Sequence, residues 1–494
     1  MRTTYGMWRQ EGDDVLGFPP TALAGGGGLV LLMIPLLAHS WVLLGVFGPP
    51  AVLLGAAALI RVQGRLVLSW MGVVGRYAMT EVVVGTAFAA PNLTRTENAS
   101  GEAVDSDEWE LPGILHPLRH LAAQDDAGRL VAILAYPPTG IYSMVASVRH
   151  SGTALLDEED LDRRVAGWGA LLASECEEDG LARISVYEHI DRGEGGELGR
   201  WIDQHLARGV PAQATEMVKE MARADRTLNT SRRTWVVIGV EEARARREIR
   251  GFGGGDEGAR RILVRRARAV AARLSTIGLE LDHWVDPTEL FSLVRQSYDP
   301  AYRGEADLGG APLRAREAGP NVAKAKFGSY CHDGYESVTW ELGWSESPRQ
   351  ASVLAGLLGG DGVSRRALAL HCEPLPRSRA MREIGSARTK AEVAREVGRR
   401  TGRLERASAR RARAITERQD AALAEGAGIV RFTGFVTATV PVGGDLDGAV
   451  AGVRNDAGFG GIRVLRCAGW MDSAFAAGVV PVGGLSLGKR KVLG

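Results

Sequence analysis

The sequence predicts an α+β protein in which an N-terminal transmembrane helical hairpin precedes a bilobed cytoplasmic body of two similar mixed-sheet lobes. Three observations lead to this class. Residues 15–60 are 46 consecutive residues without Asp, Glu, Lys or Arg. Strand and helix patterns alternate over the rest of the chain, and the same order of patterns occurs twice. The chain has 494 residues, so two domains fit after residue 90.

The uncharged run is long enough for two membrane crossings, because a bilayer core of about 30 Å takes about 20 apolar residues per helix. We place the two helices at about 21–38 and 41–60. The alternatives are a single span at 29–47 and a cleaved signal peptide. Arginines occur on both sides of the run, which favours an even number of spans with both termini and the body in the cytoplasm. The expected location is therefore the bacterial inner (cell) membrane, as a multi-pass protein.

Three segments outside the lobes have distinct compositions. The N-terminal segment 1–90 consists of the hairpin and residues 61–90. Residues 61–90 contain Arg65, Trp70 and Tyr77, which suit the headgroup zone of a membrane, so an interfacial elbow is predicted there. A first soluble helix explains the same pattern equally well. Residues 91–110 are rich in Asn, Ser, Asp and Glu, which predicts a linker. Residues 481–494 predict a flexible tail.

The first lobe is expected at residues 111–300. Its predicted elements are strands at 130–136 and 141–148, a helix at 160–174, a strand at 182–189, a helical region at 198–223, a strand at 234–240, a basic helix at 257–274, a strand at 279–282 and a helix that begins at the Asp286-Pro287 cap.

The second lobe is expected at residues 321–480. Its predicted elements are strands at 326–330 and 336–342, a helix at 347–358, a strand at 367–372, a long Arg-rich helix at 379–424, a strand at 428–440, a helix at 445–456, a strand at 462–467 and a helix at 471–477. Both lobes then have the order ββαβαβαβα, which indicates an internal repeat.

Composition limits the classes of function. The net charge is +1, so the whole protein has no electrostatic preference for nucleic acid. The four cysteines lie far apart, with no C-x-x-C pair, so the expected state is four reduced thiols and no zinc site.

Possible catalytic motifs each have a structural explanation that fits better. Gly483, Gly488 and Lys489 match the start of a phosphate loop, but Arg490 stands where Ser or Thr must follow, and the helix is missing. Residues 251–255 form a Gly-rich loop without the dinucleotide spacing, and the acidic residues at 175–179 lack the ligand spacing of a metal site. We predict no catalytic, cofactor-binding or metal-binding residues, no cofactor and no enzymatic activity.

The sequence Cys331-His332-Asp333-Gly334 places a thiol, an imidazole and a carboxylate side by side. Neighbouring residues of a strand point to opposite faces, whereas triad members converge from separate segments. Asp-Gly is also a strong two-residue hairpin signal. The predicted structure is a strand, a turn and a strand.

One surface stands out by its charge. Residues 377–418 contain 13 Arg and one Lys against five Glu, so this helix can face phosphates or anionic lipid. A solvated helix with Glu and Arg three or four residues apart is the alternative, and direct nucleic-acid contact is not favoured because no aromatic residues are interleaved. The possible interaction surface consists of Arg395, Arg399, Arg400, Arg403, Arg406, Arg410 and Arg411.

Several short motifs resemble a family of actinobacterial membrane proteins encoded in conjugation-type loci beside a separate conjugation ATPase. They are Thr4 to Arg9, Leu111-Pro112-Gly113, Asp126 to Arg129, Thr139 to Tyr142, Val165 to Gly169, Ser297 to Pro300, Arg466-Cys467, and a string from Tyr330 through His332, Asp333 and Gly334 to Thr339 and Trp340. In plan the family is similar to the small two-helix inner-membrane subunit of type IV secretion systems fused to the non-motor N-terminal part of their ATPase.

The resemblance implies a structural inner-membrane subunit of a type IV-like secretion or conjugation machine that anchors and docks a separate ATPase. Its expected partners are that ATPase, other secretion membrane subunits, membrane lipid and a second copy of the chain. A type VII-like secretion component is the main alternative. A membrane-bound enzyme that uses Cys331 and His332 is the third hypothesis.

Overall fold

The structure is a computed structural model, and it describes residues 49, 61–62, 65–83, 85–90, 109–150, 157–177, 181–192, 210–225, 230–302, 312–343, 351–359, 364–400 and 407–486. The predicted transmembrane helices at 21–38 and 41–60 lie outside these residues, apart from Pro49, as does most of the predicted linker. No helix within the described ranges combines the length and the apolarity needed to cross a bilayer.

The first half of the body, called the first repeat (residues 119–298), has most of its elements near the predicted positions. They are β4 (Arg119–Gln124), β5 (Leu130–Tyr136), β6 (Ile141–His150), α5 (Glu158–Glu177), β7 (Arg183–Arg192), α7 (Ala212–Asp225), β8 (Thr230–Glu241), α8 (Glu242–Gly251), α9 (Gly255–Thr276), β9 (Leu279–Trp284) and α10 (Pro287–Tyr298). Neither β4 nor α8 is predicted from the sequence. Helix α8 buries only Ala245 and Ile249, which is too few apolar positions to give a helical pattern.

The second half, called the second repeat (residues 322–479), follows the same plan. Its elements are β10 (Val322–Ala325), β11 (Tyr330–His332), β12 (Tyr335–Gly343), η4 (Ala351–Leu354), α11 (Ala355–Gly359), β13 (Arg365–Leu375), α12 (Arg377–Arg400), α13 (Ala407–Ala424), β14 (Ile429–Pro441), α14 (Leu446–Phe459), β15 (Arg463–Arg466) and α15 (Met471–Val479). Outside the two repeats lie β1 (Arg61–Val62), β2 (Arg65–Leu66), α3 (Val67–Val83), β3 (Ala87–Ala89), η1 (Gly113–Leu115) and η3 (Ala315–Glu317).

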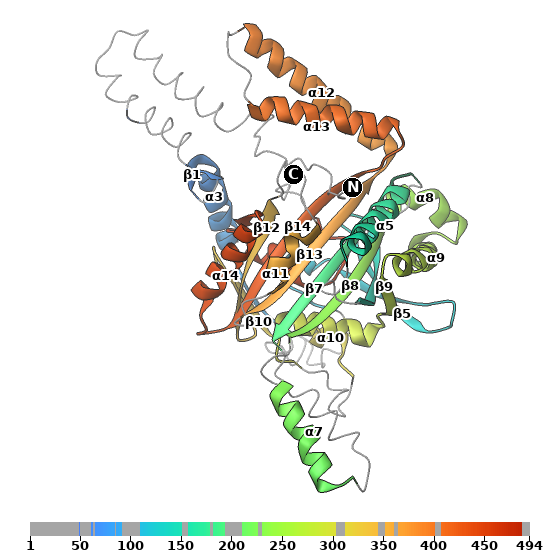
Figure 1. The fold of residues 1–494 in the computed structure, drawn as a ribbon, viewed down its shortest axis with the longest axis vertical. Coiled ribbons are helices and arrows are strands. Elements are labelled where there is room, and N and C mark those ends of the chain that lie inside the picture. The colour runs from blue at the N-terminus through green and yellow to red at the C-terminus, as the bar shows by residue number, and fades with distance from the viewer. Residues whose placement is uncertain are drawn as a thin grey trace, which may run out of the picture.

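Both repeats contribute to one sheet of 13 strands, with the order β3-β10-β11-β12-β14-β13-β7-β8-β6-β5-β4, β9 beside β6 and β15 beside β12. All pairings between these strands are antiparallel. Figure 1 shows the central strands running side by side through the middle of the molecule. The predicted fold class is therefore wrong: the body has one continuous antiparallel sheet and not two lobes with mixed sheets.

The two repeats meet at β7 and β13, where residues 184–190 pair with residues 366–372. From this junction outward the strand order is β7-β8-β6-β5-β4 on one side and β13-β14-β12-β11-β10 on the other. The equivalent strands thus follow a pseudo-twofold arrangement, in agreement with the repeated element order of the sequence. The sequence could not reveal the fusion of the sheets, because the β7–β13 pairing joins residues far apart in the chain.

The two faces of the sheet carry different helices. Side chains alternate between the two faces along a strand, so residues that pair directly across the junction lie on the same face. Tyr187 of β7 and Ala369 of β13 are one such pair. On this face lie α10 and α15, which form one large core with η1. On the opposite face of the first repeat, α5, α8 and α9 cover a second core.

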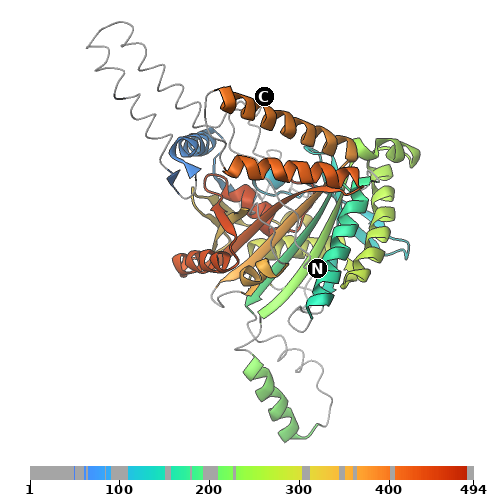
Figure 2. The same cartoon turned by 45° about the horizontal axis from the view of Figure 1, so that its top comes forward.

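The region between β13 and β14 differs from its prediction. The expected single helix at 379–424 is a pair of helices, α12 and α13, which pack against each other and project from one end of the sheet (Figures 1 and 2). Gly402 lies between them in sequence, and glycine has a low helix propensity. At the corresponding place in the first repeat, α7 projects from the other end of the sheet (Figure 1).

The predicted interfacial elbow at residues 61–90 contains α3. The rings of Trp70 and Tyr77 lie 5.9 and 5.4 Å from the ring of Phe327, between β10 and β11. Tyr77 also donates a hydrogen bond to the carbonyl of Ala325 at 3.2 Å. One side of α3 is thus fixed on the second repeat, whereas Val74, Met79 and Val82 are exposed.

Candidate functional site

The motif around His332 forms the hairpin that the sequence predicts. His332 pairs with Tyr335, so Asp333 and Gly334 make up a two-residue loop. Their φ angles are 39° and 84°. Positive φ at both positions matches the type I′ turn that suits the twist of a hairpin, and Asp-Gly tolerates it well.

His332 is buried and fully engaged in hydrogen bonds. Its Nδ1 donates to the carbonyl of Tyr298, and its Nε2 accepts from the hydroxyl of Ser337 at 2.8 Å. Burial lowers the pKa of His332 to about 4, so the ring is neutral at pH 7. Since both ring nitrogens already have partners, this histidine joins the hairpin to the end of α10 and is not poised as a base.

Cys331 lies on the opposite side of the same strand. The burial pattern of β11 alternates, with Cys331 half-buried between the buried Tyr330 and His332. Burial raises the pKa of the Cys331 thiol. A nucleophilic cysteine needs a lowered thiol pKa and a base on the same side of the strand. The geometry of Cys331 and His332 provides neither.

Asp333 connects three segments through its carboxylate. It accepts hydrogen bonds from the backbone N–H groups of Asn321 and Val322, each at 3.0 Å. The guanidinium of Arg295, on α10, lies 2.8 Å from the same carboxylate and donates to the carbonyl of Gly319 at 2.7 Å. Both charged side chains are almost completely buried. Together with the bond from His332 to the carbonyl of Tyr298, these contacts bring the 297–300 and 330–334 motifs together, although the two motifs are separate in the sequence.

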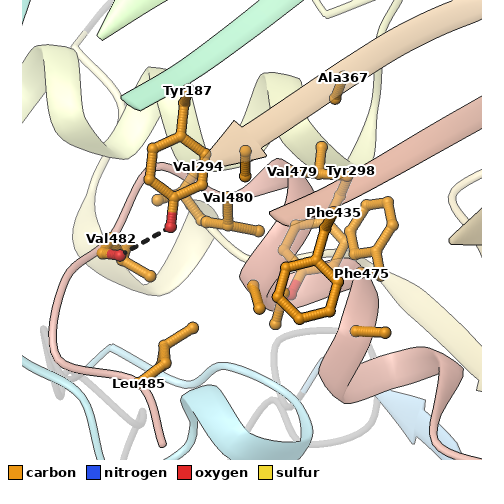
Figure 3. Packing of buried hydrophobic residues seen from close by; sticks show 14 of the residues in the cluster. Tyr187, Val294, Tyr298, Ala367, Phe435, Phe475, Val479, Val480, Val482 and Leu485 are labelled. Atoms are coloured by element: carbon orange, nitrogen blue, oxygen red, sulfur yellow. Dashed lines mark hydrogen bonds between the residues drawn. The ribbon is translucent and has the colours of Figure 1, made fainter. Parts of the chain in front are cut away.

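The other residues of the family-like motif are also core residues. The hydroxyls of Thr339 and Thr437 lie 2.9 Å apart on neighbouring strands. Trp340, on the other face, is 1% exposed. The ring of Tyr330 lies 5.1 Å from that of Phe475 on α15, and Figure 3 shows Phe475 beside Tyr298 and Phe435. These side chains hold α10 and α15 on the sheet.

A segment that the sequence analysis did not select crosses the repeat junction. Five of its backbone carbonyls accept hydrogen bonds from side chains of the sheet and its turns. The pairs are Ala477 with His371, Val479 with His189, Val482 with Tyr187, Gly484 with Thr139, and Leu485 with Arg183. Figure 3 shows the bond from Tyr187 to Val482. We call residues 477–485 the C-terminal strap; it runs from α15 of the second repeat onto the first repeat.

The strap explains Gly483, the first glycine of the pattern that resembles a phosphate loop, and the neighbouring Gly484. A Cβ at Gly483 would lie 2.3 Å from the Cβ of Ser143, and one at Gly484 would lie 2.9 Å from the Cβ of Tyr136. Residues 481–485, at the start of the predicted flexible tail, are buried, whereas residues 487–494 lie outside the described part of the chain. These glycines permit close packing of the backbone. The run of small residues at the end of α15 is the feature of the sequence that could have predicted this close packing.

Of the predicted interaction surface, Arg395 is exposed on α12 and Arg410 is exposed on α13. Arg399 and Arg400 are on α12 and Arg411 is on α13, while Arg403 and Arg406 lie outside the described residues. A small groove of about 170 Å³ separates the bases of the two helices, and Met381, Arg388 and Leu423 are among its lining residues. The arginines are therefore distributed over two packed helices.

The described residues contain no group of three or more His, Cys, Asp or Glu side chains that could hold a metal ion. One cavity there has a volume of about 250 Å³ and lies beside β6, β8 and α10. Its Arg233 is already bound to Asp191 at 2.8 Å and to Gln296 at 2.6 Å. The geometry of the described part of the chain thus offers surfaces for docking, and the charged groups that line this cavity are already paired.

Comparison with known proteins gives one family match. A family model described as "Putative type VII ESX secretion system translocon, EccE" matches residues 228–330, about a fifth of the chain. The matched segment runs from β8 through α10 to Tyr330. No curated protein matches the chain. Over this segment the chain is similar to a component of a secretion-system translocon, and the match supports the type VII alternative better than a type IV fusion protein.

Proposed function

We propose that the protein is a non-catalytic structural component of a type VII-like secretion translocon, where it is associated with the membrane and binds other translocon subunits. The observation that carries this proposal is the EccE match over residues 228–330. That segment includes α10, which is anchored to the second repeat by Arg295 and by the carbonyl of Tyr298. The match therefore includes one of the contacts between the two repeats, although the β7–β13 junction lies outside it.

The chemistry of the former catalytic candidates supports a structural role. The raised pKa of the Cys331 thiol disfavours the thiolate. Both nitrogens of His332 have partners, and Asp333 has the partners of a buried ion pair. Each group contributes to folding, which is what a rigid docking body requires.

The α12–α13 pair is the proposed docking surface for another subunit. It extends beyond the sheet (Figure 2) and carries exposed arginines on both helices. Complementary charge on a partner speeds association and fixes orientation more than it adds affinity. We expect the partner surface to be acidic.

Co-purification tests this function. The tagged full-length chain is extracted from its native membrane, and the proteins that accompany it are identified by mass spectrometry. Recovery of type VII translocon subunits is the expected result. Recovery of a conjugation ATPase instead would replace the proposal by the type IV-like hypothesis, and an activity abolished by Cys331→Ala without loss of the complex would favour the enzyme hypothesis.

A charge-reversal pair tests the docking surface. Arg395→Glu with Arg410→Glu should reduce recovery of the partner subunit. The matched control is Arg454→Glu with Arg463→Glu, which reverses two exposed arginines of the same repeat on α14 and β15. Equal recovery from both variants would exclude the α12–α13 surface as the docking site.

A further inference from the structure

The corner between α8 and α9 carries an unusual combination of side chains. Arg246, Arg247 and Arg250 are exposed on one face of α8, because residues three and four apart lie on the same side of a helix. Phe252 follows directly in the connecting loop and is 37% exposed. We call these four residues the arginine–phenylalanine corner.

The three arginines are not neutralised by neighbouring carboxylates among the residues that the structure describes. Glu248, on the same helix, pairs with Arg265 at 2.8 Å and Arg266 at 2.9 Å. Glu257, at the start of α9, pairs with Arg261 at 2.8 Å. Asp256 pairs with Arg119 at 3.2 Å, and Glu241 pairs with Arg244 at 2.7 Å. Glu242 lies one turn before Arg246 on α8 and is exposed, so it offsets part of the charge of Arg246. Most of the positive charge of the corner is therefore available to an external anion.

Phe252 stands at the start of a glycine-rich turn. Gly253, Gly254 and Gly255 all have positive φ, at 106°, 75° and 51°, a conformation that other residues rarely adopt. The N–H of Phe252 donates to the carbonyl of Glu248 at 3.1 Å, and the guanidinium of Arg265 lies 5.3 Å from the centre of the Phe252 ring. The turn therefore presents a partly exposed apolar ring beside the arginines of α8.

The base of the corner is packed tightly. A Cβ at Gly258 would lie 2.2 Å from the carbonyl oxygen of Ile249, so α8 and α9 are in close backbone contact. Arg244 also donates to the carbonyl of Pro374 at 3.2 Å, which fixes α8 beside the end of β13. The arginine–phenylalanine corner thus cannot bury Phe252 by a small rearrangement of α8.

We propose that the arginine–phenylalanine corner contacts the surface of an anionic lipid bilayer, with the three arginines at the headgroups and Phe252 inserted among them. Clustered basic residues beside one exposed apolar side chain fit an interfacial contact. A single aromatic ring does not provide the series of stacking positions that single-stranded nucleic acid uses. The inference rests on the proposed membrane association and adds the residues that orient the body on the bilayer.

An environment-sensitive fluorophore at residue 252 tests the contact. The full-length chain with Cys331→Ser and Phe252→Cys is labelled with a nitrobenzoxadiazole dye and mixed with phosphatidylcholine vesicles, with or without phosphatidylglycerol. Phe459→Cys provides the matched control, because Phe459 is also followed by glycine and is 90% exposed on α14. Phosphatidylglycerol should increase the fluorescence at 252 but not at 459, and brominated lipid should quench it at 252.

Replacing Arg246, Arg247 and Arg250 by glutamine in the labelled chain should raise the vesicle concentration at half-maximal signal by about a hundredfold, since each arginine near an anionic surface contributes about a fivefold factor. No response at 252, or an equal response at 459, would overturn the proposal. A response to duplex DNA without anionic lipid would assign the corner to nucleic acid instead. The glutamine variant should still co-purify with translocon subunits. If the unaltered chain itself co-purifies with no translocon subunit, the proposed function is refuted, whatever the vesicle result.

Discussion

Substitution of Asp333 by alanine is expected to destabilise the protein strongly. The change removes the buried carboxylate that lies 2.8 Å from Arg295 and accepts hydrogen bonds from the N–H groups of Asn321 and Val322. The Arg295 side chain remains almost completely buried. Loss of one member of a buried ion pair is destabilising because the other charge is left without compensation.

The magnitude follows from what remains around Arg295. Breaking a buried pair reduces the free energy of unfolding by about 3–5 kcal/mol. The lower end applies here, because Arg295 keeps the carbonyl of Gly319 at 2.7 Å and the carboxylate of Asp299 at 3.5 Å. The φ of 39° at residue 333 adds about 1 kcal/mol when alanine replaces aspartate. The expected total is about 4 kcal/mol.

Urea unfolding of the full-length chain, followed by tryptophan fluorescence, measures this loss. Asp333→Asn is the matched control, because asparagine keeps an acceptor oxygen and tolerates the left-handed backbone; its expected loss is about 2 kcal/mol. Arg295→Met and the double variant complete a mutant cycle. The two single losses should exceed the loss of the double variant by about 2–3 kcal/mol.

A coupling energy below about 0.5 kcal/mol would refute the assignment of Asp333 and Arg295 as a buried pair. An Asp333→Ala loss equal to the Asp333→Asn loss would show that neither the backbone conformation nor the acceptor oxygens matter. Either result would also weaken the role of this pair in joining the two repeats.

Three further predictions concern the core. Burial holds the pKa of His189 and His371 at about 3 and that of His332 at about 4, below the usual 6.5. The unfolded chain therefore binds more protons than the folded chain below pH 6.5, and each histidine should lower the free energy of unfolding by about 2 kcal/mol when the pH falls from 7 to 5. Equal urea midpoints at the two pH values would contradict this prediction. Gly483→Ala should destabilise the protein by about 1–3 kcal/mol, because the added methyl group overpacks against Ser143. The control is Gly385→Ala, at an exposed position of α12 with open space around it, which should stabilise the protein by up to about 1 kcal/mol. The opposite order of thermal midpoints would refute the position of the C-terminal strap. Iodoacetamide should modify Cys331 before the buried Cys176, Cys372 and Cys467. The reaction at Cys331 should still be slower than that of a free thiol, because the pKa of Cys331 is raised. Mass spectrometry follows the modification, and a fast reaction of Cys331 at pH 7 would favour the enzyme hypothesis.

Local patterns in the sequence determined most of the individual elements. Strand-like runs on either side of the turn residues Pro137 to Gly140 located β5 and β6. The Asp286-Pro287 cap located the start of α10, where the Asp286 carboxylate accepts from the N–H of Glu289 at 2.9 Å. Asp333 and Gly334 determined a tight turn. These features depend on residues close together in the chain, so their physical causes are visible in the sequence.

The C-terminal strap and the buried polar residues under it were decided only by the tertiary structure. His189, His371 and Arg183 look like ordinary strand residues, and their hydrogen bonds reach carbonyls about 100 to 300 positions away. The sequence likewise gave no sign that α8 would expose three arginines largely without acidic partners, because the pairing of Glu248 with α9 depends on how the helices pack.

The repeat itself shows the same division between sequence and structure. The order of strands and helices was encoded twice in the sequence, since each element forms from its own local pattern. The fusion of both halves into one antiparallel sheet was decided by the β7–β13 pairing. Backbone hydrogen bonds between strands carry no information about side-chain identity, so only the packed structure shows which edges meet.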